Sequence, residues 1–138
     1  MVLTPTFGQV YAELEQEHRE LMALVERIHG FRTTVGLVPV LEELHTLLIR
    51  HFSREQFPGG LYECMGAYGS RHHDELKELV RDHCVILSAV RGLLERVRTA
   101  GPREEPVLLG TVSDVLAQLH DHEQREHALA DKLRVQNE

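Results

Sequence analysis

The chain has 138 residues, of which 42% are hydrophobic and 27% are charged, as is ordinary for a folded globular protein. This length suits one domain with its own core, so we expect a single domain over residues 1–138. The net charge of −7 leaves no basic surface for nucleic acid, and no apolar run is long enough to span a membrane.

Apolar residues recur at helical spacing in four segments, and the alternation typical of strands is absent. The first segment covers residues 5–29, where Thr4 is a suitable N-cap and Gly30 a suitable stop. The second covers residues 38–57 and ends at a proline followed by two glycines.

A glycine-rich connection, LYECMGAYGS, leads to the third segment, which begins near Ser70 and is broken by Gly101 and Pro102. The fourth segment begins near Pro106. Short connections between amphipathic helices make neighbouring helices antiparallel. The predicted fold is therefore all-α, an up-down-up-down antiparallel four-helix bundle.

Polar residues interrupt the inward, apolar face of every helix. Burying such groups without partners would be costly, so their positions call for an explanation. Each histidine lies near the middle of its helix, and antiparallel packing therefore brings the set into one layer. The set comprises His18, His51, Glu55, His83, His122 and Glu126.

The two halves of the chain echo each other around these positions. EHRELMALVERI around His18 matches DHCVILSAVRGL around His83, and HFSRE from His51 matches HEQRE from His122. The pattern predicts a bundle with pseudo-twofold symmetry and a polar site on its axis.

The run HDHEQREH, residues 120–127, offers several candidates in the fourth helix. The echo and the apolar stripe both select His122 and Glu126, while His120 and His127 lie about 100° and 80° from the stripe. Glu123 lies nearer the stripe, so Glu123 with His127 stays open as a weaker alternative.

Imidazole nitrogens and carboxylate oxygens without thiolate suit iron, with manganese or zinc possible. Cys64 and Cys84 are too few for a disulfide framework or a thiolate zinc site, and Cys84 points away from the stripe. With no signal peptide in MVLTPTFGQVYAELEQEH, we expect a cytoplasmic protein. The two glutamates, one in each half, can bridge two metal ions.

These motifs resemble those of the hemerythrin-like, or HHE cation-binding, domains over nearly the whole chain. The resemblance rests on EH at 17–18, HFSRE at 51–55, DH at 82–83 and HEQRE at 122–126. It implies a non-haem centre of two iron ions with a bridging oxygen species (Fe-O-Fe). Such a centre binds or senses dioxygen, or reacts with peroxide or nitric oxide.

The chain departs from the oxygen-carrying members of that family. Carriers use a fifth histidine in the third helix, where this chain has Leu79 and Leu87 around His83, and a later aspartate in the last helix, where it has His127. The resemblance therefore implies sensing, iron handling or small-molecule turnover rather than carriage. Candidates to replace the missing ligand are His45, Tyr62, Tyr68 and His73.

The sequence leaves alternatives both for the function and for the role of two arginines. The protein is either a binding protein or an oxidoreductase, because both use the same ligands. A metal-free or zinc-bound helical interaction module, in which each glutamate accepts from a histidine, is a further alternative. Arg54 and Arg125, at equivalent places in the two halves, are either surface residues or partners of the glutamates.

Overall fold

A computed structural model describes residues 7–56, 60, 62 and 72–136 of the chain. All regular structure in these residues is helical, and none of them lies in a strand, as the sequence predicts. The elements are α1 (Phe7–His29), α2 (Leu37–Gln56), α4 (His73–Thr99), a 3-10 turn (Pro102–Glu104) and α5 (Glu105–Gln136).

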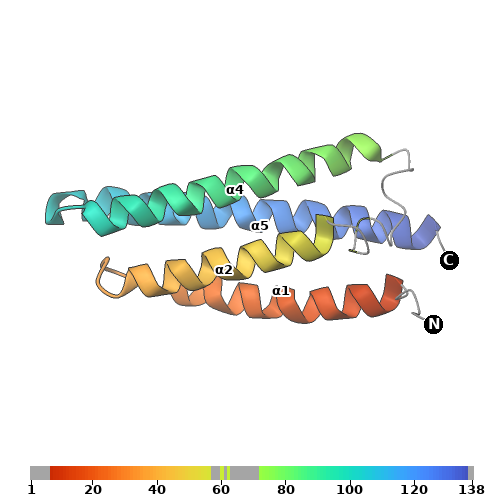
Figure 1. The fold of residues 1–138 in the computed structure, drawn as a ribbon, viewed down its shortest axis with the longest axis horizontal. Helices are drawn as coiled ribbons and strands as arrows, with labels where there is room; N and C mark the ends of the chain where they lie inside the picture. The colour runs from red at the N-terminus through yellow and green to blue at the C-terminus, as the bar shows by residue number, and fades with distance from the viewer. Residues whose placement is uncertain (1–6, 57–59, 61, 63–71, 137–138) are drawn as a thin grey trace.

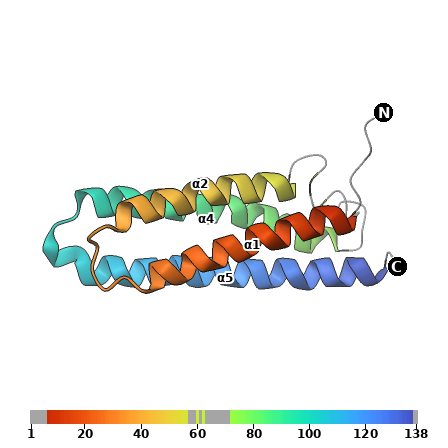
Figure 2. The same ribbon diagram turned by 90° about the horizontal axis from the view of Figure 1, so that it is seen from below.

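The helices run along the long axis of the molecule in alternating directions (Figure 1). α1 packs against α2, α2 against α4, and α4 against α5. Figure 2 shows the bundle from below, with α1 running beside α5 and both ends of the chain at the same end of the molecule. This arrangement agrees with the predicted up-down-up-down order.

Local signals set the ends of the helices. At the end of α1 the amide of Gly30 donates to the carbonyls of Glu26 and Arg27 at 3.2 Å each, and Gly36 takes a positive φ of 76° just before α2. The intervening loop is tied to the start of α5, because Glu105 accepts hydrogen bonds from the Thr34 amide and hydroxyl. α4 begins at His73, later than expected, and Ser70 lies outside the described residues.

The apolar core forms two clusters, one on each side of the inward polar residues. The larger cluster includes Leu21, Leu48, Ile86 and Leu119, towards the α1–α2 loop. The smaller one lies towards the chain ends and comprises Leu14, Tyr62, Leu76, Leu79, Leu129, Ala130 and Leu133. Each buried aliphatic side chain contributes about 1.5–3 kcal/mol of transfer free energy, so the apolar clusters hold the polar layer in place.

Among the described helices, none combines the length and the apolar character that a membrane span requires.

Candidate metal centre

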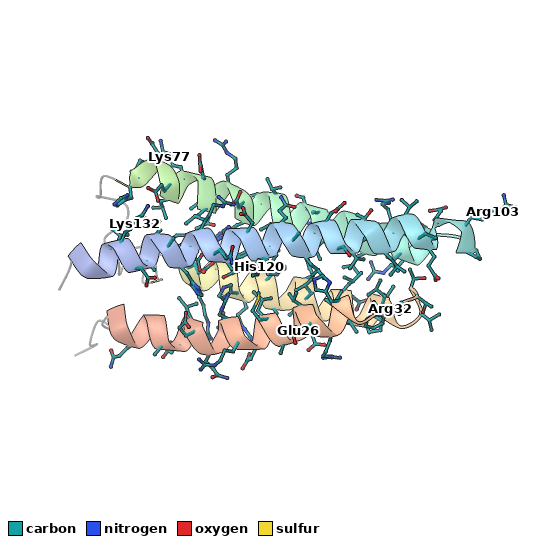
Figure 3. The ribbon with its side chains drawn as sticks, turned by 180° about the vertical axis from the view of Figure 1, so that it is seen from behind. Glu26, Arg32, Lys77, Arg103, His120 and Lys132 are labelled. Carbon is teal, nitrogen blue, oxygen red and sulfur yellow. The ribbon has the colours of Figure 1, made fainter. Side chains whose placement is uncertain are left out.

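The structure brings the six predicted residues together in one layer of the bundle. His51, Glu55, His83, His122 and Glu126 are buried, and the side chain of His18 is 17% exposed. Two further carboxylates, Glu17 and Glu123, are buried in the same layer. His120 is exposed on the outer side of α5, as expected from its helical angle (Figure 3).

Two overlapping groups of side chains within this layer could each hold a metal ion. In each group the potential ligand atoms lie within 4.8 Å of one another. One group is Glu55, His83, His122 and Glu126, and the other is His51, Glu55, Glu123 and Glu126. Glu55 and Glu126 belong to both groups, so each of these carboxylates faces both positions.

Glu123 joins the layer although the sequence favours His122 and Glu126 alone. Positions 122, 123 and 126 span about 100° of the helix surface, a sector wide enough to face the centre of the bundle. His127 does not follow Glu123 inward. Its side chain is 37% exposed, and its Nε2 lies 3.1 Å from Glu15 Oε1 on α1. Of the weaker alternative, Glu123 thus lies in one of the two groups, while His127 lies in neither.

His18 lies beside the second group rather than within it. Its Nε2 is 3.3 Å from Glu123 Oε2, and its ring makes an edge contact with the His127 ring at a centroid distance of 4.5 Å. A cavity of about 10 Å³, enough for roughly one water molecule, is bounded there by Leu14, Glu15, His18, His51, Glu126, His127 and Ala130. The cavity lies at the edge of the layer, between residues of α1 and α5.

Tyr62 is the one proposed substitute ligand that reaches the layer among those that the structure describes. Its hydroxyl donates to Glu126 Oε2 at 2.7 Å and lies 3.2 Å from His83 Nε2. His45 instead lines a separate groove with Arg91, and His73 starts α4, about 15 Å along the helix from His83. Tyr68 lies outside the described residues.

The residue that follows the histidine differs between the echoing segments HFSRE and HEQRE. Phe52 follows His51 as Glu123 follows His122. The Phe52 ring stacks on the His83 ring, with centroids 4.0 Å apart and planes 8° apart. The group that contains His83 is therefore lined by an aromatic ring, whereas the group that contains His51 has a third carboxylate, Glu123.

Several polar atoms that point into the layer have no hydrogen-bond partner among the described residues. They are Nε2 of His18, His51 and His122 and both carboxylate oxygens of Glu55 and Glu123. Buried polar atoms in this state cost about 1–3 kcal/mol each, and such clusters need an explanation. Cations between the nitrogens and oxygens would satisfy these atoms, so the donor set fits a metal centre.

The buried carboxylates of the layer also favour a positive charge beside them. Burial and the Glu126 charge raise the pKa of Glu55 well above its usual range. Burial alone would lower the pKa of His51, but Glu123 and Glu17 outweigh burial and raise that pKa from 6.5 to about 10. The layer thus holds protons where no cation balances its carboxylates.

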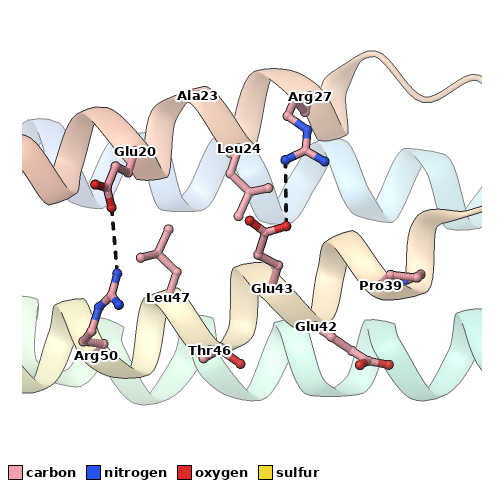
Figure 4. Close-up of a pocket in the computed structure, with 10 residues that line it drawn as sticks. All are labelled: Glu20, Ala23, Leu24, Arg27, Pro39, Glu42, Glu43, Thr46, Leu47 and Arg50. Carbon is pink, nitrogen blue, oxygen red and sulfur yellow. Dashed lines mark ion pairs between the residues drawn. The ribbon is translucent and has the colours of Figure 1, made fainter.

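A larger groove of about 750 Å³ lies on the surface between α1 and α2 (Figure 4). Ion pairs of 3.8 Å cross it from Arg27 to Glu43 and from Arg50 to Glu20. None of the inward histidines lines it, so the candidate chemistry lies in the layer and not in this groove.

Comparisons of the chain with protein-family models, with curated proteins and with solved structures find no match.

Proposed function

We propose that the protein is a non-haem di-iron protein of the hemerythrin-like type that binds or senses dioxygen or a related small molecule. The observation that carries the proposal is the sharing of Glu55 and Glu126 by two groups of ligands. Two carboxylates that each face two positions are suited to bridge a pair of metal ions.

The ligand chemistry is compatible with iron. The layer offers imidazole nitrogen and carboxylate oxygen, and Cys84, the described cysteine, is exposed. Such a donor set suits iron and also accommodates manganese or zinc. When bound, iron would supply a reversible change of oxidation state. The chain would hold the ions and exclude bulk water through the apolar clusters on both sides of the layer.

An oxidoreductase acting on peroxide or nitric oxide is a second candidate. The buried hydroxyl of Tyr62, hydrogen-bonded to Glu126, supports this alternative because a phenol can donate a proton or an electron close to the ions. Consumption of added peroxide or nitric oxide over many turnovers would favour it. A reversible spectral change without consumption would favour binding or sensing.

A helical interaction module without metal is less well supported. In it, Glu55 and Glu123 would have, among the described residues, only contacts of 3.3–3.5 Å to histidine nitrogens and no hydrogen bond, whereas a cation between these atoms would satisfy both. Zinc in place of iron would satisfy the same atoms, so only metal analysis separates that alternative.

The test is elemental analysis of the purified full-length chain, together with absorption spectra before and after exposure of the anaerobic iron(II) protein to air. We expect two iron ions per chain and new oxo-to-iron charge-transfer bands in the near ultraviolet. His120→Ala is the matched control and is expected to keep both ions, because this histidine is exposed. Zinc alone, or a folded chain that binds no metal, would contradict the proposal.

A further inference from the structure

The acid that precedes His18 contacts a different histidine of the layer. Glu17 Oε1 accepts a hydrogen bond from His51 Nδ1 at 3.1 Å, which links α1 to α2. The other oxygen of Glu17 is 2.8 Å from Nη1 of Arg54, one helical turn after His51. The carboxylate is therefore held between the imidazole and the guanidinium.

The second half of the chain repeats this arrangement. Asp82, which precedes His83, accepts a hydrogen bond from His122 Nδ1 at 3.1 Å and so links α4 to α5. Arg125, which follows His122 by the same interval as Arg54 follows His51, donates to the same oxygen of Asp82. Neither arginine is thus a simple surface residue, although both side chains are partly exposed.

A carboxylate that accepts from Nδ1 fixes both the tautomer and the rotation of an imidazole ring. In the neutral ring, which a bound metal ion requires, the proton then resides on Nδ1, and the lone pair of Nε2 faces the centre of the bundle. In this structure Nε2 of His51 lies 3.4 Å from Glu55 Oε2, and Nε2 of His122 lies 3.6 Å from Glu126 Oε2. Glu17 and Asp82 therefore each orient one histidine nitrogen towards one of the two ligand groups.

We propose that Glu17 with Arg54 and Asp82 with Arg125 are two positioning pairs, each of which serves one metal ion. This inference rests on the proposed di-metal function. Glu17 and Arg54 orient His51 towards the ion that Glu123 would also contact. Asp82 and Arg125 orient His122 towards the ion that His83 would also contact. The acid before each first histidine and the arginine after each second histidine, which the internal echo repeats, would thus both orient a metal ligand.

The two pairs are not equivalent. The Glu17 side chain is 6% exposed, whereas that of Asp82 is 23% exposed. Arg125 also binds Asp121 at 2.9 Å, so Asp82 shares its arginine. Loss of Glu17 is therefore expected to weaken binding more than loss of Asp82.

The experiment titrates the full-length metal-free protein with cobalt(II) in competition with a chelator, and follows the visible bands of the bound ion. The wild type is expected to bind two ions. Glu17→Ala and Asp82→Ala are each expected to bind one ion as the wild type does and the other about 10–100-fold more weakly. Glu17→Gln, whose amide oxygen still accepts from His51 Nδ1, is expected to recover most of the lost affinity.

Matched controls remove ion pairs between the same helices without contact to a histidine of the layer. Glu20→Ala removes the pair with Arg50 across α1 and α2 (Figure 4), and Glu75→Ala removes the pair of 3.4 Å with Lys132 across α4 and α5. Both variants are expected to bind two ions with unchanged affinity.

The outcomes separate this inference from the proposed function. A wild type with two ions, and alanine variants that bind both as the controls do, would overturn the positioning role and leave the di-metal proposal standing. A wild type that binds no ion would overturn both. If Glu17→Ala does not fold, Arg54→Ala decides. Weaker binding of one ion in Arg54→Ala would support the pair, and wild-type affinity for both ions would contradict it.

Discussion

The hydroxyl of Tyr62 donates a hydrogen bond of 2.7 Å to Glu126, a carboxylate that faces both candidate metal positions. The same hydroxyl lies 3.2 Å from Nε2 of His83. A residue from the connection after α2 therefore closes the layer on the side of His83, while the one-water cavity beside His18 borders the other side. The two sides of the layer therefore differ.

We predict that Tyr62 binds iron(III) through its phenolate oxygen. Burial and the charge of Glu126 raise the pKa of Tyr62 well above its usual range, so a nearby cation is needed for deprotonation. The iron(III) protein is then expected to show a visible tyrosine-to-iron charge-transfer band that Tyr62→Phe abolishes without loss of iron. In the metal-free protein, where the phenol keeps its proton, the variant would leave Glu126 without this donor, at a cost of about 1–3 kcal/mol in the free energy of unfolding. An unchanged visible spectrum in Tyr62→Phe would restrict the residue to hydrogen bonding.

Glu55→Gln is expected to lower the stability of the protein only when metal is bound. In the metal-free protein, the substitution removes a carboxyl group that burial and Glu126 keep from ionising easily, so the free energy of unfolding rises or stays constant. In the iron-loaded protein, it removes a shared ligand and lowers stability by about 1–3 kcal/mol or more. Thermal unfolding with and without iron measures both changes. His120→Ala serves as control, and a loss of stability by Glu55→Gln in both states would argue for a purely structural glutamate.

The stability of the metal-free protein is expected to fall as pH rises from about 6.5 to 10, because His51 and Glu55 both hold protons in the folded state that the unfolded chain releases. Carboxylates raise the pKa of His51 to about 10, so the stabilisation from its protonation is complete below pH 6.5 and is lost as pH rises to about 10. Burial and His122 lower the pKa of His83 to about 3, so protonation favours the unfolded chain as pH falls below 6.5. Urea unfolding after removal of metal, from about pH 4 to 10, measures this dependence. Stability that climbs steadily above pH 7 would show that His51 is not held as a cation.

Access of small anions to the layer is expected to depend on His127. Its ring covers His18 at 4.5 Å, and both residues border the cavity between α1 and α5. His127→Ala would widen this passage without removing a member of either ligand group. Stopped-flow mixing of the iron protein with azide is expected to show binding about tenfold faster than in the wild type. Equal rates in His127→Ala and His120→Ala would place the access route elsewhere.

The sequence by itself determined the helical class, the order of the helices and most of the polar layer. Helical periodicity depends on neighbours three and four positions away, so the inward direction of His51 with Glu55 and of His122 with Glu126 could be deduced locally. The central position of these residues in their helices was enough to predict one shared layer, because the middles of antiparallel helices coincide.

The tertiary structure alone decided which other groups reach the layer. Glu17 and Glu123 lie at the edges of their helical stripes, and only the rotation of α1 against α2 and of α5 against α1 turns them inward. Tyr62 comes from a connection whose path no periodicity specifies. Contacts between helices depend on distances and rotations set by the packing of the whole bundle, and a one-dimensional pattern does not contain them.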